Sequence, residues 1–289
     1  MNRDEALKKS DEALKELSTA LQQGKSETLV EYLDMLSRFH QYSFGNCILI
    51  YLQKPDASFV AGFGRWKELN RFVRKGEKGI SILAPMVGKK KKDAEASEVQ
   101  AGPSSKASNE ESPKVLYGFR VVYVFDVSQT EGEELPEFAP LGGDPGDKIQ
   151  RLEEIIRGHG IEIEFVEGLP GDANGMSEGG KISINSTIPK PQMFSTMVHE
   201  LAHELLHWGD RREATTKVVR ETEAEAVAFV VCRSVGLECS TRAADYIQLW
   251  NGDDKILMQS LELIRTVASK IIHDLEPTKV EAEEVAHVA

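Results

Sequence analysis

One short motif constrains this 289-residue chain more than any other feature: His199-Glu200-Leu201-Ala202-His203, an H-E-x-x-H pattern. Residues four apart lie on one face of a helix, so both imidazoles can point at a single ion with Glu200 beside them. Apolar residues at helical spacing predict that helix, and Gly209 predicts its end. Histidine pairs at this spacing also occur in helices without catalytic roles, so the motif alone does not establish a metal site.

A second predicted helix offers the missing ligand. A catalytic zinc site has three protein ligands and one position open to water. Glu221 follows His203 by 18 residues, enough for the first helix to end, for a polar loop at 210–217 to turn the chain, and for an antiparallel helix to begin. Glu221 and Glu225 are four apart and share a face. We therefore predict a metal site in preference to a plain charged helix.

H-E-x-x-H followed by a helix carrying E-x-x-A-E resembles the gluzincin arrangement of zinc metallopeptidases. Within that group it resembles the ImmA/IrrE-type metallopeptidases and the C-terminal domain of ArdC-like antirestriction proteins. The resemblance implies that His199, His203 and Glu221 bind Zn²⁺, with Mn²⁺ as the alternative ion. It makes Glu200 the catalytic base and Glu225 the partner that orients a ligand histidine through its other ring nitrogen. Several relatives have Asp or Asn at the position of Glu225.

Three further residues lie near this constellation. His207 continues the same helix face one turn beyond His203, and we expect it to support the site and not to bind metal, because the metzincin spacing H-E-x-x-H-x-x-G-x-x-H is absent. Glu223 is expected on another face of its helix, exposed to solvent. Tyr246 is one candidate for the group that stabilises an oxyanion, and the sequence does not decide it.

The N-terminal part contains a basic, aromatic segment. Between Tyr51 and Lys92 there are 11 Lys or Arg against 3 Asp or Glu, a net charge of +8 inside a chain of −12. The interleaved aromatic residues are Phe59, Phe63, Trp66 and Phe72. Binding of single-stranded nucleic acid needs cations for phosphates and ring faces for unpaired bases. Composition alone is more typical of a solvated basic hairpin, and Trp66 fits the core as well as it fits a binding surface.

The order of residues in this region resembles the N-terminal single-stranded-DNA-binding domain of ArdC-like proteins. The matching elements, spanning about residues 5–135, are Tyr42-Ser43-x-x-Asn46, Gln53-x-Pro55, Gly62-Phe63-x-x-Trp66, the run RKGEKGI at 74–80 and the run VFDVSQT at 124–130. The resemblance implies single-stranded DNA as a partner. The candidate contact residues are Arg65, Trp66, Lys67, Arg71, Arg74, Lys75 and Lys78. Tyr42 and Asn46 are equally compatible with a structural role.

These patterns predict an α+β protein of two domains. Residues 1–135 form a helical, small-sheet DNA-binding domain with a disordered insertion at about 88–113, and 136–146 are a linker. Residues 147–277 form a zincin-like metallopeptidase domain with the H-E-x-x-H helix and a helical C-terminus, followed by a mobile acidic tail at 278–289. Zincins bind substrate backbone along an edge strand; residues 181–186 are either that strand or a core strand.

Composition narrows the function classes. The chain has no 18-residue apolar run and no signal-peptide core, and Cys47, Cys232 and Cys239 are expected to be reduced, so we predict a cytoplasmic protein with no membrane partner. The predicted function is a zinc-dependent metalloendopeptidase coupled to single-stranded DNA binding, in antirestriction or a related mobile-element or stress role, with an unknown protein substrate. Two alternatives stay open: a DNA-shielding protein whose metal domain cuts nothing, and an ImmA/IrrE-type peptidase that cleaves a repressor.

Overall fold

The computed structural model describes residues 2–23, 27–89, 114–134, 143–238 and 254–276. Helices and strands are mixed throughout, which confirms the predicted α+β class. The helices are α1 (Arg3–Gln22), α2 (Glu27–Phe39), α3 (Phe44–Gln53), α4 (Phe63–Glu68), α5 (Lys148–Gly158), α6 (Lys190–Leu206), α7 (Asp210–Ala214), α8 (Lys217–Ser234) and α9 (Asp254–Leu275). The strands are β1 (Val60–Gly62), β2 (Arg71–Val73), β3 (Ile80–Lys89), β4 (Lys114–Asp126), β5 (Thr130–Gly132), β6 (Glu162–Val166), β7 (Gly175–Ser177) and β8 (Lys181–Asn185).

Parts of the predicted organisation fall outside the described residues. β3 runs to Lys89 and so takes in the first two residues of the predicted insertion, while 90–113 are not described. Most of the predicted linker and the predicted tail also lie outside the described residues. So does the segment 239–253, which contains Cys239 and Tyr246. Cys47 and Cys232 are buried, and no described helix has the length and apolar character needed to cross a membrane.

The N-terminal half packs three helices against a small antiparallel sheet of order β1-β4-β3. Helix α3 closes the outer edge of β3 with two side-chain amides. Asn46 exchanges two hydrogen bonds of 2.8 Å with the backbone of Leu83, and Gln53 exchanges bonds of 2.9 and 3.0 Å with that of Ser81. An open strand edge is a template for unwanted pairing, so these amides satisfy backbone groups that would otherwise be exposed. The structure therefore gives Asn46 a structural role.

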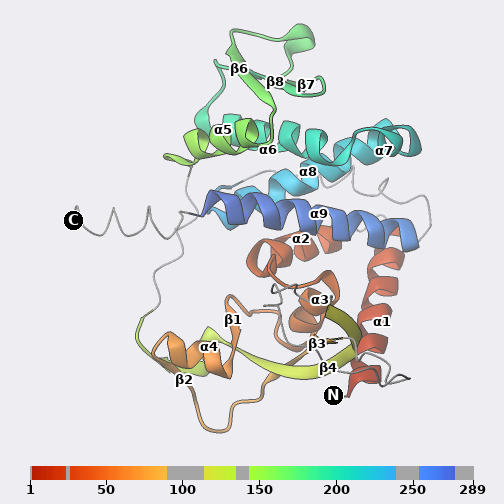
Figure 1. Ribbon diagram of the computed structural model, residues 1–289, viewed down its shortest axis with the longest axis vertical. Helices are drawn as coiled ribbons and strands as arrows, with labels where there is room; N and C mark the ends of the chain where they lie inside the picture. Colours follow the sequence, from red (N-terminus) through yellow and green to blue (C-terminus); the bar gives the residue numbers. More distant parts are fainter. Residues whose placement is uncertain (1, 24–26, 90–113, 135–142, 239–253, 277–289) are drawn as a thin grey trace, which may run out of the picture.

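The C-terminal half places α5 and α6 under a second sheet of order β6-β8-β7 (Figure 1). β8 pairs with β6 in parallel and with β7 in antiparallel fashion, so it is the central strand. The reading of residues 181–186 as a substrate-binding edge strand is therefore wrong, because both of its edges are already hydrogen-bonded. The edge next to the H-E-x-x-H helix is β7, which contacts α6 directly.

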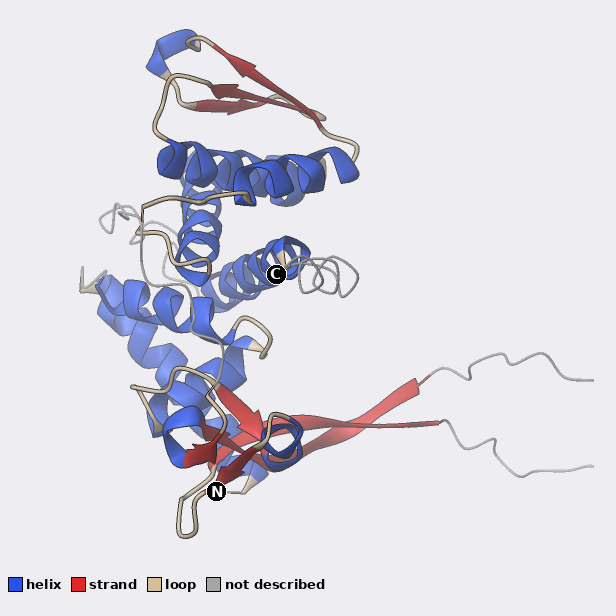
Figure 2. Cartoon of the chain, turned by 90° about the vertical axis from the view of Figure 1, so that its left-hand side faces the viewer, coloured by secondary structure: helices blue, strands red, loops and turns tan. Residues whose placement is uncertain are grey.

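The two halves share one apolar core. Helix α9 lies between the α6–α8 layer and the N-terminal helices, and α2 packs on α8 (Figure 1). Fully buried side chains from both halves, such as Leu33, Leu201 and Leu261, belong to one continuous cluster. From this body the strands β3 and β4 project together as a long two-stranded ribbon (Figure 2).

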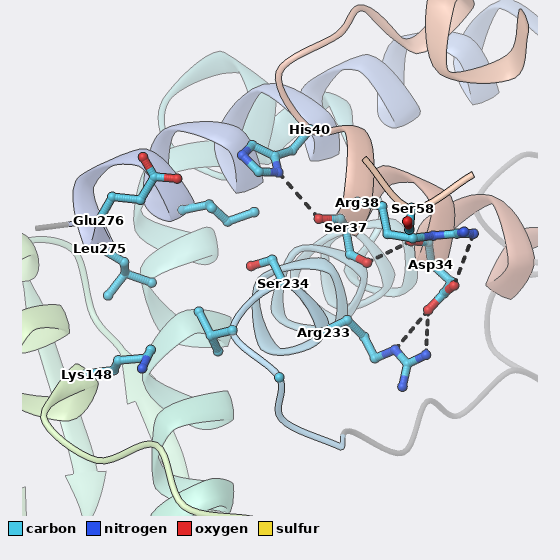
Figure 3. Close-up of a pocket in the computed structure, with 13 residues that line it drawn as sticks. Asp34, Ser37, Arg38, His40, Ser58, Lys148, Arg233, Ser234, Leu275 and Glu276 are labelled. Carbon is cyan, nitrogen blue, oxygen red and sulfur yellow. Dashed lines mark hydrogen bonds and ion pairs between the residues drawn. The ribbon is translucent and has the colours of Figure 1, made fainter. Parts of the chain in front are cut away.

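A cavity of about 560 Å³ lies at the junction of α2, the end of α8 and the end of α9 (Figure 3). On its wall Asp34 accepts hydrogen bonds of 2.9 and 2.6 Å from Arg233, and its second oxygen lies 3.4 Å from an Nη atom of Arg38. This ion pair links α2 to α8. Leu275 and Glu276 line the cavity at the end of α9, and none of the residues of the H-E-x-x-H motif does.

Candidate metal site

Two packed helices position the site. Helix α6 follows Pro189 and buries Phe194, Met197, Val198 and Leu201 along one side, which leaves His199 and His203 together on another. Helix α8 begins at Thr216, whose hydroxyl caps it by accepting from the Val219 N–H at 3.2 Å. The close packing of α6 on α8 brings the first turns of α8 to the histidine face.

His199, His203 and Glu221 converge on one point. The two Nε2 atoms are 3.1 Å apart, and they lie 3.4 and 3.5 Å from the same carboxylate oxygen of Glu221. A tetrahedral zinc with ligand bonds of about 2.0–2.1 Å would hold its ligand atoms roughly 3.3 Å apart. The triangle therefore fits a small divalent cation, and two imidazoles with one carboxylate suit Zn²⁺ or Mn²⁺.

The histidines and carboxylates of the site shift one another's pKa values. Burial lowers the pKa of His199, but hydrogen bonds with Glu221 and Glu225 outweigh it and raise that pKa to about 9. The same contacts with His199 and His203 hold the pKa of Glu221 well below its ordinary value. Glu225 lies 3.6 Å from His199 Nδ1, behind the ring as viewed from the ligand triangle. Glu221 thus lies where the two Nε2 atoms meet, and Glu225 lies beside the other ring nitrogen of His199.

Glu200 lies beneath the edge strand β7. Its side chain is buried, and burial raises the pKa of the carboxyl while His199 and His203 oppose that rise. A Cβ atom at Gly175 would lie 2.7 Å from Glu200 Oε1 and 2.5 Å from Thr196 Cγ2. The strand can approach Glu200 this closely only because position 175 has no side chain. A carboxylate of raised pKa beside an edge strand is suited to accept and return a proton.

The next residue of α6 that faces the sheet is Glu204, and it fixes the β7–β8 turn. Its carboxylate accepts from Ser177 Oγ at 2.6 Å and from the N–H groups of Gly179 and Gly180 at 2.9 Å each. Trp208 fills the space beside Gly179, where a Cβ would lie 2.2 Å from the indole ring. These contacts hold the edge strand β7 in place over α6.

A buried polar network lies behind His203. His207 Nδ1 is 2.9 Å from His203 Nδ1, and His207 Nε2 is 2.9 Å from Glu223 Oε2. Glu223 also accepts from Arg211 at 2.6 and 2.7 Å and from Ser260 Oγ at 2.6 Å. Burial, with His203 beside it, lowers the pKa of His207 against the opposing effect of Glu223. The network connects the site to α7, α8 and α9.

The expectation that Glu223 is solvated is wrong, because its side chain is fully buried. Helix α8 lies between α6, α2 and α9, so it is covered on more than one side, and consecutive residues Thr222, Glu223 and Ala224 are all buried. A helix-face argument assigns only one buried side. The sequence feature that could have predicted burial of Glu223 is His207, because the two side chains can hydrogen-bond to each other in a core.

The predicted DNA-contact residues separate into two groups. Trp66 is fully buried, donates from Nε1 to the Phe125 carbonyl at 2.9 Å and packs edge-on against Phe59, so its prediction as a stacking surface is wrong. Arg71 bonds to Thr130 and to the Glu133 carbonyl, and Arg74 bonds to Glu77 and the Ser128 carbonyl. Both arginines hold the β2–β5 pair together.

The remaining candidates lie at the surface. Arg65 is exposed and forms an ion pair of 2.9 Å with Glu68. Lys67, Lys75 and Lys78 are exposed on α4 and on the loop between β2 and β3. These four cations are therefore accessible to a phosphate backbone.

A family model matches the N-terminal part of the chain. Residues 3–125 match the family model described as the N-terminal domain of anti-restriction factor ArdC. An uncharacterised protein of Bacillus anthracis is 25% identical over 286 residues, covering 86% of this chain and 48% of that protein, so the chain spans about half the length of this curated relative. The metal-site residues lie outside the matched range 3–125.

Two solved structures are similar to the chain. The antirestriction protein ArdC from plasmid R388 in its metal-free form has a TM-score of 0.46 and 18% identity, covering 80% of this chain and 84% of that chain. The Mn(II)-bound form of the same protein has a TM-score of 0.45 and 17% identity, covering 81% of this chain and 85% of that chain.

Proposed function

We propose that this protein is a metal-dependent peptidase with a DNA-binding N-terminal half, acting in antirestriction. The observation that carries the peptidase proposal is the convergence of two imidazoles and one carboxylate, 3.1 to 3.5 Å apart, with the buried acid Glu200 next to them. Three ligands with an open fourth position are typical of catalytic sites, whereas structural zinc sites are closed by four protein ligands.

The residues have separate tasks in this proposal. His199, His203 and Glu221 would hold the ion, and Glu225 and His207 would orient the two rings. When bound, the ion supplies a water of lowered pKa and polarises the scissile carbonyl. Glu200 takes the proton of the attacking water and passes it to the leaving amine. β7 offers an extended peptide an edge to pair with, directly above Glu200.

The proposed DNA binding rests on the family match of residues 3–125 and on the exposed cations of that half. Antirestriction is the role printed for the matched family, and it brings a protein into contact with incoming DNA. Because the metal site lies in the other half, DNA binding and hydrolysis can be tested one at a time.

The test begins with metal content. Elemental analysis of the purified wild-type chain should find zinc or manganese near one equivalent, and His199→Ala and Glu221→Ala should lose it. Glu200→Gln should keep the ion but lose cleavage of fluorescent casein and of a mixed peptide library read by mass spectrometry. Glu213→Gln, which changes an exposed acid on α7, is the matched control and should behave as wild type.

Two outcomes would contradict the proposed peptidase activity. If Glu200→Gln cleaves as well as wild type, the proposed catalytic role is wrong. If metal-loaded wild type cleaves nothing while Glu200→Gln still protects DNA from restriction in a plasmid-transfer assay, the protein acts by shielding DNA and the peptidase proposal fails.

A further inference from the structure

The ribbon of β3 and β4 carries an exposed aromatic face. Two rings of β4 are exposed, Tyr123 by 53% and Phe119 by 36%, and Phe63 at the start of α4 is 61% exposed. Most soluble proteins do not leave large ring systems clustered in water, and such patches mark binding surfaces.

Strand pairing shows that these rings share one side. Side chains alternate between the two faces of a strand, so Phe119, Val121, Tyr123 and Phe125 point the same way along β4. The other face at the base of the ribbon carries Ile80, Ile82, Val122 and Val124, which pack into the core or against it. The aromatic side is therefore the one turned away from the core.

Phe63 extends this surface at the body end. Its ring meets the Phe125 ring edge-on, with centroids 6.4 Å apart. We call the set Phe63, Phe119, Tyr123 and Phe125 the aromatic row. Alternate residues of a strand lie about 6.6 Å apart, so Phe119 and Tyr123 span roughly 13 Å and can contact more than one unit of an extended ligand. At the outer end a register shift between Met86 and Val87 bends the ribbon.

The exposed cations lie at the same end of the ribbon as Tyr123. A Cβ added at Gly79 would lie 2.9 Å from the Tyr123 Cβ, so the loop that carries Lys75 and Lys78 passes directly against that tyrosine. Lys67 lies on α4, the helix that begins with Phe63. Rings in a row with cations beside them are the combination that single-stranded nucleic acids require, since bases stack on rings and phosphates need positive charge.

We infer that the aromatic row is a single-stranded-DNA-binding surface, with bases stacked on Phe119 and Tyr123 and the phosphate backbone against Lys75 and Lys78. This inference rests on the proposed DNA binding and specifies its location. It replaces Trp66, which is buried, with Phe119 and Tyr123, which were not among the candidate contact residues. The flanking lysines favour DNA over a protein ligand, because phosphates need positive charge beside the rings.

The test uses the full chain and a fluorescein-labelled oligo-dT of about 15 nucleotides, the upper range of one binding module. Fluorescence anisotropy measures Kd at constant salt. Tyr123→Leu and Phe119→Leu remove a ring and keep an apolar side chain, and each should weaken binding roughly 5- to 150-fold, the range measured for one stacked base. Tyr123→Trp should retain wild-type affinity. Because these side chains are exposed, thermal denaturation should show unchanged Tm values.

Phe165→Leu is the matched control. Phe165 is 37% exposed, close to the 36% of Phe119, but it lies on β6 in the other half. This variant should bind oligo-dT as wild type does. A duplex of the same length offers no unpaired bases, so its weaker binding should not respond to Tyr123→Leu.

The outcomes are distinguishable. If wild type does not bind oligo-dT, the proposed DNA binding fails. If wild type binds and both leucine variants bind equally well, DNA lies elsewhere and the inference is overturned. If the leucine variants instead convert a dimer to a monomer in sedimentation equilibrium with DNA affinity unchanged, the row is a contact between copies of this chain and the inference is likewise overturned.

Discussion

The Nδ1 atoms of His203 and His207 face each other at 2.9 Å, so one ring must donate a proton and the other must accept it. If His203 binds an ion through Nε2, its Nδ1 carries the proton and His207 Nδ1 accepts. His207 must then be protonated on Nε2, from which it donates to Glu223 at 2.9 Å. A single pair of tautomers satisfies every one of these contacts, and it is the pair that metal binding requires.

The first prediction concerns His207. Replacing it with Phe keeps a buried ring and removes the acceptor, so the affinity for zinc should fall roughly 10- to 100-fold, as for other groups that orient a ligand histidine. His207→Gln restores a carbonyl acceptor and should recover part of the affinity. Competition with a chromogenic chelator measures both. A purely structural role for His207 would lower the Tm of both variants and leave the zinc affinity of each unchanged.

The second prediction concerns the proton that His199 releases when a metal binds. His199 has its pKa raised to about 9 in the metal-free protein, and a histidine must be neutral to bind a metal. Zinc binding at pH 7 should therefore release a proton from His199. Because of this proton, the apparent affinity for zinc should rise about tenfold per pH unit up to pH 9. Calorimetry in buffers of different ionisation enthalpy counts the protons. Glu225→Gln removes one contact that raises this pKa and should reduce the release at pH 8.

The same shift gives a stability test with a definite sign. The folded-state pKa of His199 lies above its ordinary value, so its ion pairs stabilise the metal-free fold below about pH 6.5, the unperturbed histidine value. That contribution is lost as the pH rises through 9. The Tm of the metal-free protein should fall over this range by more than that of His199→Gln. Equal slopes for the two proteins would show that His199 is not protonated in the folded state.

The third prediction separates metal binding from turnover. Gly175→Ala places a methyl group 2.7 Å from Glu200 Oε1 and 2.5 Å from Thr196 Cγ2, so the strand or Glu200 must move. We expect a loss of about 1–3 kcal/mol in stability and a large drop in casein cleavage, with metal content preserved. Gly158→Ala is the control, because a Cβ there meets no atom within 4 Å. Full activity in Gly175→Ala would mean that Glu200 has no fixed position under β7.

The local part of the site was predictable from sequence. His199, Glu200 and His203 are set by spacing within one helix, and Glu221 by the chain length needed to return antiparallel. Those arguments use only the geometry of a helix and a turn, and the structure brings these four side chains together.

What sequence patterning misses depends on contacts between distant segments. Glu223 is buried because α2 and α9, far away in the chain, cover the second side of α8. Trp66 is buried because β4 supplies its acceptor at Phe125, 59 positions later. The central place of β8 was not decidable either, because β7 is only three residues long and gives no period to detect.

The fourth prediction concerns the lysines beside the aromatic row. Counterion release gives a slope of about −0.7 in log Kobs against log salt for each phosphate neutralised on a single strand. Replacing Lys75 and Lys78 together with Ala should therefore reduce the slope for oligo-dT by roughly 1.4. Arg71→Ala, whose guanidinium is bound to Thr130 and Glu133, should lower the Tm and leave the slope unchanged. The opposite pattern, a slope sensitive to Arg71 but not to the lysines, would place the DNA backbone along β2 and away from the loop that contacts Tyr123.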